Sequence, residues 1–225
     1  MTIIDNLQSA PPLEVFPQWR PAQLEVDRRA RAAVLAPAVL RTTALLPPDL
    51  AECVTEWFTG TPTAPADAVR RSYDALVRET GRLFDVAAFD LGVRVEYVHS
   101  DSDPYDSAAE LCAELRERGT MTLTTIACED PHPLLGGAEG GVVDQLRVVH
   151  DVFGHAALGL GFDLQSEYAT WLQCRALFSP VARPAAFCEL VGAVTAYVTT
   201  GEKPGLRADL PPIELLASLD RARGS

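Results

Sequence analysis

Apolar residues recur every three to four positions through nearly every long segment of this chain, which is the periodicity of amphipathic helices. The clearest case is the segment 67–88, in which Val69, Tyr73 and Leu76 fall on one side. This pattern restricts the chain to a mainly helical fold. Further helices are expected over residues 22–40, from Pro48 through Phe58, and over 107–118, 142–160, 164–178 and 184–200.

Two short segments are expected to form strands instead. Residues Val93–Val98 alternate between apolar and polar side chains, and Met121–Ala127 is a second candidate. They predict a minor two-stranded sheet, so the expected fold is mostly α, of the α+β type. A length of 225 residues fits one domain. We assign residues 1–21, which are polar and proline-rich, to an N-terminal arm and residues 22–225 to a single domain.

The charge balance excludes some classes of partner. The chain has 31 acidic and 19 basic residues and a formal net charge of −12. Nucleic acids and anionic membranes attract basic surfaces, so neither is an expected partner. No uncharged apolar run approaches the ~18 residues of a membrane span, and no leader peptide is recognisable. The five cysteines form no CxxC pair. These features predict a cytoplasmic protein with reduced cysteines, and they leave its oligomeric state open.

Candidate chemistry is concentrated in one apolar segment, residues 148–156. It contains His150 and His155, with Asp151 beside the first histidine. A single histidine in such a segment is usually a core residue with a hydrogen-bond partner. Two imidazoles and a carboxylate are costly to bury without partners, so the group favours a metal site. The other two histidines are His99 and His132, and we expect His132 to be structural or to line the rim of a pocket.

The spacing of the two histidines sets a geometric condition. Residues five apart on a regular helix point about 140° apart, whereas the HExxH zinc motif places its ligands one turn apart. His150 and His155 can reach one ion only if His150 starts a helix or the turn between them is loosened. Gly154 is a suitable place for such loosening.

A carboxylate further along the chain is expected to complete the site. Glu189 is the only charged residue in the apolar stretch 184–201, so it needs a metal ion or an ion pair with Arg175 or Arg183. We predict that Glu189 is the third metal ligand. Glu167 is the competing candidate, and its more polar neighbours suit a catalytic or supporting role.

Two histidines and one carboxylate form the facial triad of non-heme iron(II) enzymes. The segment from His150 to His155 resembles the histidine motif of the iron-dependent aromatic amino acid hydroxylases. That family uses HxxxxH and a downstream glutamate on an apolar helix, and Glu189 follows His155 by 34 residues. The resemblance implies a helical domain around a metal centre. It does not extend to the pterin-binding segments of the family.

A longer resemblance, over residues 73–197, is to a poorly characterised group of bacterial and phage proteins. The shared block R-x-V-H-D-x-F-G-H-A corresponds to residues 147–156, and its order supports a functional site there. The other shared features are Asp103-Pro104-Tyr105, His132-Pro133, Gly161-Phe162, Glu167, Trp171, Ser179–Arg183 and Glu189.

These features predict an oxygenase or oxidase that uses Fe²⁺ and O₂ to oxidise a C–H bond of a small, amino-acid-like metabolite, in a natural-product pathway for instance. Arg183 would bind a carboxylate of 2-oxoglutarate as co-substrate or of the substrate, and otherwise lies on the surface. Asp151 would orient a ligating imidazole. One alternative is a zinc-dependent hydrolase with Glu167 or Asp151 as general base. The other is a non-catalytic structural or partner-binding protein.

Overall fold

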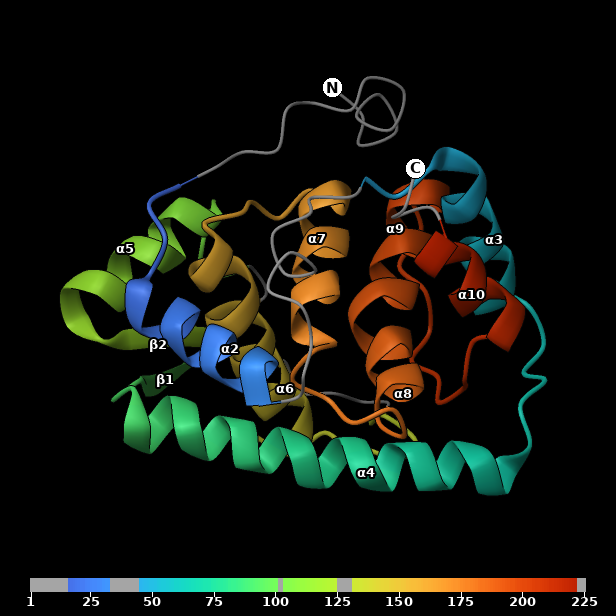
Figure 1. Ribbon diagram of the computed structural model, residues 1–225, viewed down its shortest axis with the longest axis horizontal. Helices are drawn as coiled ribbons and strands as arrows, with labels where there is room; N and C mark the ends of the chain where they lie inside the picture. The colour runs from blue at the N-terminus through green and yellow to red at the C-terminus, as the bar shows by residue number, and fades with distance from the viewer. Residues whose placement is uncertain (1–15, 33–44, 101–102, 125–130, 222–225) are drawn as a thin grey trace.

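The computed structural model describes residues 16–32, 45–100, 103–124 and 131–221, and most of them are helical (Figure 1). The α-helices are α2 (Arg20–Ala32), α3 (Pro48–Thr59), α4 (Ala66–Asp85), α5 (Ala108–Arg118), α6 (Val142–His150), α7 (Leu164–Cys174), α8 (Arg183–Phe187), α9 (Ala193–Thr200) and α10 (Ile213–Arg221). Three π-helical segments continue α-helices: η2 (Val86–Asp90), η3 (Asp151–Ala156) and η4 (Cys188–Gly192). The prediction of a mostly helical fold is confirmed.

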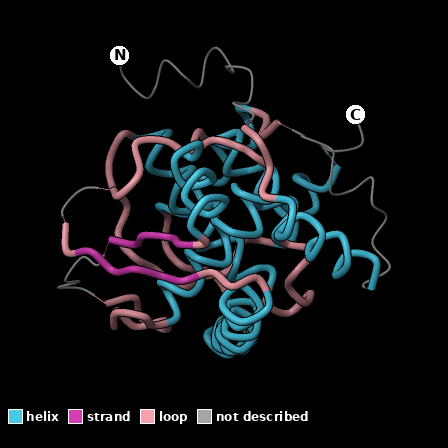
Figure 2. The backbone as a smooth tube through the Cα atoms, turned by 90° about the vertical axis from the view of Figure 1, so that its left-hand side faces the viewer, coloured by secondary structure: helices cyan, strands magenta, loops and turns pink. Residues whose placement is uncertain are grey.

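One small sheet accompanies the helices. Strands β1 (Arg94–Val98) and β2 (Thr120–Thr124) pair in parallel, from Arg94 opposite Thr120 to Val98 opposite Thr124. Helix α5 makes the crossover that parallel strands require. Figure 2 shows the two strands side by side at one edge of the helical body. The predicted two-stranded sheet is confirmed, although residues 125–127 of the second predicted strand lie outside the described residues.

The long helix α4 forms the base of the molecule (Figure 1). Its apolar side buries Tyr73, Leu76 and Leu83, as the periodicity predicts. This side packs against α6 and α8, the helices that lead into the η3 and η4 segments. The fold thus places two irregular helical segments above one regular helix.

The termini of several predicted helices differ in the structure. The predicted helix 164–178 ends at Cys174, where the Ala176 N–H bonds to the Gln173 carbonyl at 3.0 Å and tightens the turn. The predicted helix 184–200 is one run from Arg183 to Thr200, with η4 inside it. Helix α10 was not predicted, although Leu215 and Leu219 carry a helical spacing and are buried.

The described end of the predicted N-terminal arm packs on the domain. The Phe16 N–H bonds to the Gly159 carbonyl at 2.6 Å, and the Trp19 N–H bonds to the Ala156 carbonyl at 2.7 Å. Gly159 has a φ of +70°, and a Cβ there would lie 2.1 Å from the Phe16 carbonyl oxygen. Residues 16–19 therefore cover the end of η3. No helix among the described residues has the length and apolar character to cross a membrane.

Candidate metal centre

The π-helical turn η3 brings the two histidines together. A π-helix bonds residue i to residue i+5, so positions five apart fall about one turn apart. His150 and His155 stand at this spacing, and their ring centroids are 4.7 Å apart at an interplanar angle of 86°. Of the two arrangements that would let both histidines reach one ion, the structure therefore has the loosened turn.

Gly154 allows η3 to lie directly against α7. A Cβ at Gly154 would lie 2.9 Å from the Thr170 Cβ and 3.4 Å from the Cys174 Sγ. The Gln173 side chain, also on α7, donates a hydrogen bond of 2.7 Å to the Phe153 carbonyl within η3. This contact satisfies a backbone acceptor in the irregular turn. Because of this close packing, the first turn of α7 lies next to the histidines.

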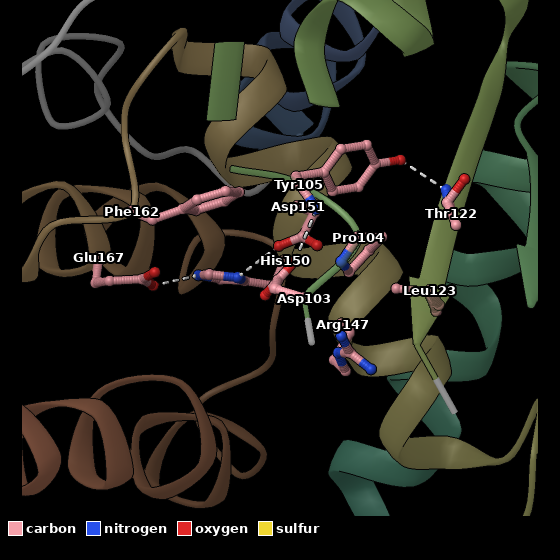
Figure 3. Close-up of a pocket in the computed structure, with 10 residues that line it drawn as sticks. All are labelled: Asp103, Pro104, Tyr105, Thr122, Leu123, Arg147, His150, Asp151, Phe162 and Glu167. Carbon is pink, nitrogen blue, oxygen red and sulfur yellow. Dashed lines mark hydrogen bonds and ion pairs between the residues drawn. The ribbon is translucent and has the colours of Figure 1, made fainter. Parts of the chain in front are cut away.

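Glu167 lies in that first turn and faces both imidazoles. Asp163 caps the helix, accepting hydrogen bonds from the Gln165 and Ser166 N–H groups at 3.0 Å each. The Glu167 Oε2 lies 3.2 Å from the His150 Nε2, and its Oε1 lies 3.4 Å from the His155 Nε2. Figure 3 shows Glu167 directed at the His150 ring. The structure thus places Glu167, the competing candidate from the sequence, next to the two histidines.

The outer nitrogen of each imidazole is held by an acceptor. The His155 Nδ1 lies 3.2 Å from the Leu160 carbonyl, and the His150 Nδ1 lies 3.1 Å from the Asp151 Oδ1. Because these oxygens only accept hydrogen bonds, both Nδ1 atoms carry hydrogen. In the neutral rings the lone pairs then sit on Nε2, the atoms that face Glu167. Metal-ligating histidines typically have their other ring nitrogen held by an acceptor in this way.

The His155 Nε2 is the atom of the site that most clearly calls for a proton or a metal ion. It is buried and has no hydrogen-bond partner among the described residues. In the neutral ring its lone pair would face the carboxylate of Glu167, and two acceptors at this distance repel each other unless a proton or a metal ion lies between them. The donor set of two imidazoles and one carboxylate suits zinc and iron. The residues therefore fit a divalent transition-metal ion.

In the metal-free protein, a proton on His150 supplies part of the positive charge that faces Glu167. Burial opposes the charging of His150, but Glu167 and Asp151 outweigh it and raise the pKa of His150 to about 10. Burial likewise opposes the ionisation of Glu167, yet the two imidazoles lower its pKa to about 2. The site therefore stabilises positive charge between these three side chains.

Asp151 belongs to the same cluster. One donor atom each from His150, Asp151 and His155 lie within 4.8 Å of one another. One oxygen of Asp151 is used by the His150 Nδ1, so the carboxylate orients this imidazole. The predicted supporting role of Asp151 agrees with this contact.

Glu189 has different partners in the structure. Its Oε1 accepts a hydrogen bond from the Tyr73 hydroxyl and lies 3.2 Å from the His132 Nε2. The His132 Nδ1 accepts from the Leu134 and Leu135 N–H groups at 3.2 and 2.9 Å, so its hydrogen is on Nε2. This N–H is shared between the Glu189 Oε1 at 3.2 Å and the Arg207 carbonyl at 3.1 Å. Neither donor was recognised from the sequence, because both lie more than fifty residues from Glu189.

The carboxylate of Glu189 still borders the centre. Together with His150 and Glu167 it lines a cavity of about 240 Å³, whose other walls are mainly apolar. Its role as third ligand therefore stays a prediction. The sequence offered ion pairs with Arg175 or Arg183 as alternatives for Glu189, and in the structure the hydroxyl of Tyr73 and the imidazole of His132 contact it instead.

Arg183 ties two backbone segments together. Its Nε donates to the Arg175 and Phe178 carbonyls at 2.9 Å each, near the end of α7. It is absent from the described residues lining the cavities at the centre. Its assignment to a carboxylate of 2-oxoglutarate or of the substrate stays a prediction.

Comparison of the chain with protein-family models, curated proteins and solved structures gives no match. The interpretation of the centre therefore depends on its own residues. They define a helical protein with a buried cluster of two histidines and at least one carboxylate, placed between open cavities.

Proposed function

We propose that this protein is a mononuclear non-heme iron(II) oxygenase or oxidase in which His150, His155 and Glu167 hold the ion. The observation that carries the proposal is the convergence of the two Nε2 atoms on one carboxylate, at 3.2 and 3.4 Å. Two histidines and one carboxylate leave coordination positions free for oxygen and substrate. Bound iron would supply the activation of O₂ for oxidation of a substrate C–H bond.

The protein side chains have separate tasks in this proposal. Asp151 and the Leu160 carbonyl fix the two imidazoles with Nε2 directed toward Glu167. The His150 Nε2 also lies 3.0 Å from the Thr170 Oγ1, a contact that the ion would replace. Glu167 supplies the negative charge. Glu189, held by Tyr73 and His132, presents a second carboxylate to the adjoining cavity and is the alternative third ligand.

The substrate is proposed to be a small, amino-acid-like metabolite, with 2-oxoglutarate as the co-substrate that provides electrons. The cavities support a compact ligand: the one that borders both His150 and the aromatic residues Tyr105 and Phe162 measures about 270 Å³. The resemblance of the histidine segment to the aromatic amino acid hydroxylases favours the same reaction class. The resemblance does not extend to the pterin-binding segments of that family, which favours an electron source other than a pterin.

Anaerobic iron loading followed by oxygen-uptake measurements tests the proposal. Protein with one Fe²⁺ per chain should consume O₂ when a panel of amino acids is supplied, and omission of 2-oxoglutarate should reduce the uptake. The control is Zn²⁺-loaded protein, which should consume none. A tightly held zinc ion, hydrolytic activity and no oxygen uptake would instead support the zinc-dependent hydrolase. Absence of any bound metal would support a structural role for the histidines.

A further inference from the structure

Arg147 occupies the meeting point of the cavities around the centre. It lies one helical turn before His150 on α6. It lines the 270 Å³ cavity beside Asp151 and Phe162, the 240 Å³ cavity beside Glu189, and a third of about 230 Å³. A ligand in any of these cavities therefore lies next to Arg147.

The charges around Arg147 are strongly unbalanced. Among the described residues, it is the only lysine or arginine that lines either of the two cavities containing His150. The same cavities contain four carboxylates, those of Asp103, Asp151, Glu167 and Glu189. An anionic ligand would be repelled by these groups, so its negative charge has one favourable place, next to Arg147.

The guanidinium group has free hydrogen-bonding capacity. Its Nη1 donates to the Thr124 carbonyl at 3.0 Å and lies 3.9 Å from the Asp144 Oδ1. Among the described residues, these contacts use Nη1 alone. The Thr124 contact positions the side chain, while Nε and Nη2 offer the parallel donors that bind a carboxylate bidentately. The side chain is 40% exposed, so a ligand can reach it.

The walls of the 270 Å³ cavity indicate what the rest of the ligand is like. Pro104, Tyr105, Leu123 and Phe162 line it, and the Phe162 ring packs edge-on against His155 with centroids 4.9 Å apart. These side chains favour an apolar or aromatic group. Figure 3 shows Arg147 on one side of this space and Tyr105 and Phe162 on the other.

We propose that Arg147 binds the carboxylate of a small organic acid whose apolar part lies against Tyr105 and Phe162. The identification of this acid as the substrate rests on the proposed function. The same carboxylate chemistry is present in 2-oxoglutarate, so the acid is either the substrate or the co-substrate, and the test separates the two. The proposal adds Arg147 as a second candidate anchor for a carboxylate, beside the predicted Arg183.

Calorimetric titration of the full-length protein with three probes tests the proposal. Benzoate supplies a carboxylate on an apolar ring, benzamide has nearly the same shape without the charge, and 2-oxoglutarate is the co-substrate probe. At least one of the two carboxylates should bind. If benzoate is the one that binds, benzamide should bind about 10-fold more weakly or worse, since charge-assisted hydrogen bonds are the stronger ones.

Variants then assign the binding to Arg147. Arg147→Gln should weaken the bound carboxylate about 10-fold or more, while Arg147→Lys should recover part of the loss. Arg71→Gln removes an equal charge from a surface ion pair with Asp67 and should change nothing. Loss of benzoate binding in Arg147→Gln assigns the site to the substrate, and loss of 2-oxoglutarate binding assigns it to the co-substrate.

Three results would overturn the proposal: no binding of either carboxylate, equal binding of benzoate and benzamide without 2-oxoglutarate binding, or unchanged binding in Arg147→Gln. Metal content measured on the same samples keeps this test separate from the metal proposal. Arg147→Gln should retain the ion content of the wild type, because Arg147 contacts neither Nε2 atom. A protein that binds benzoate through Arg147 but holds no metal would contradict the proposed function alone.

Discussion

The fully buried His155 Nε2 lies 3.4 Å from the Oε1 of Glu167, a side chain that is partly exposed to the cavities. The Nδ1 of the same ring is committed to the Leu160 carbonyl, so in the neutral ring a lone pair would face the carboxylate. This relationship joins two helical segments that the sequence separates by a glycine-rich turn. It is stable only with positive charge between the two groups, and the predictions below follow from that requirement.

Replacement of one carboxylate at a time should show which one completes the metal site. Glu167→Gln preserves the shape of the side chain but removes the charge that faces both imidazoles. We expect the metal affinity to fall by about 10-fold or more. This loss should be at least as large as the losses caused by mutating residues that only hold the ligands in place. Glu189→Gln should stay within a few-fold of the wild type, because the partners of Glu189 are Tyr73 and His132. Metal titration that gives the opposite order would make Glu189 the third ligand.

Metal binding should release protons. The raised pKa of His150, about 10 against an ordinary 6.5, keeps this imidazole protonated at pH 7 in the folded, metal-free protein. The ion needs the Nε2 lone pair, so its binding at pH 7 should expel about one proton, and affinity should rise as the pH increases toward 10. Calorimetry in buffers of different ionisation enthalpy measures this number. A value near zero would mean that His150 gives up no proton to the ion.

The same raised pKa affects the stability of the metal-free protein. The favourable contribution of protonated His150 is fully present below its unfolded pKa and is lost as the pH rises through about 10. The contribution of ionised Glu167 is fully present above its unfolded pKa of 4.5 and is lost as the pH falls from there through about 2. Denaturant unfolding of the metal-free protein across this pH range measures both losses, and a stability that does not fall toward pH 10 would contradict the raised pKa of His150.

Gly154→Ala should separate η3 from α7. The new Cβ would lie 2.9 Å from the Thr170 Cβ, so the helices must shift, at a cost of about 1–3 kcal/mol in the free energy of unfolding. Metal affinity should fall as well, because Glu167 moves with α7. Gly81→Ala on α4 is the matched control: its nearest neighbour is 3.9 Å away, and it should stabilise by up to about 1 kcal/mol. Equal melting temperatures for the two variants would contradict the close contact.

Tyr73→Phe should destabilise the protein through Glu189. The variant removes one of two donors from a carboxylate within an apolar helix, which should cost about 1–3 kcal/mol. The loss should shrink in a Glu189→Gln background, since the charge that needed the donor is gone. Denaturant unfolding of the two single variants and the double variant measures this coupling. Additive losses would mean that Tyr73 acts through packing alone.

Much of the fold was predictable because it depends on local periodicity. The apolar periodicity of α4 and the alternation of β1 predicted these two elements correctly. The i, i+5 spacing of the histidines made a loosened turn one of two conditions for a shared ion, and η3 meets that condition. Helix α10 was missed because its apolar pattern is short and follows a proline-rich segment.

The carboxylates of the site were harder to assign because their environment depends on distant residues. Glu189 is isolated among apolar neighbours in sequence, but Tyr73 on α4 and His132 in a loop satisfy it in space. Glu167 has polar neighbours in sequence, yet the close contact of α7 with η3 turns it toward the histidines. Arg147 likewise became a candidate binding residue only when the cavities around it were known.

The most direct test of the central claim is the metal content of wild-type protein and His155→Ala after anaerobic loading with Fe²⁺ and removal of free ion. His99→Ala, at an exposed histidine, is the control, and circular dichroism establishes that each variant is folded. The wild type and His99→Ala should each retain one ion per chain, while folded His155→Ala should retain almost none. Equal iron in all three proteins, or none in the wild type, would contradict a metal centre at His150, His155 and Glu167.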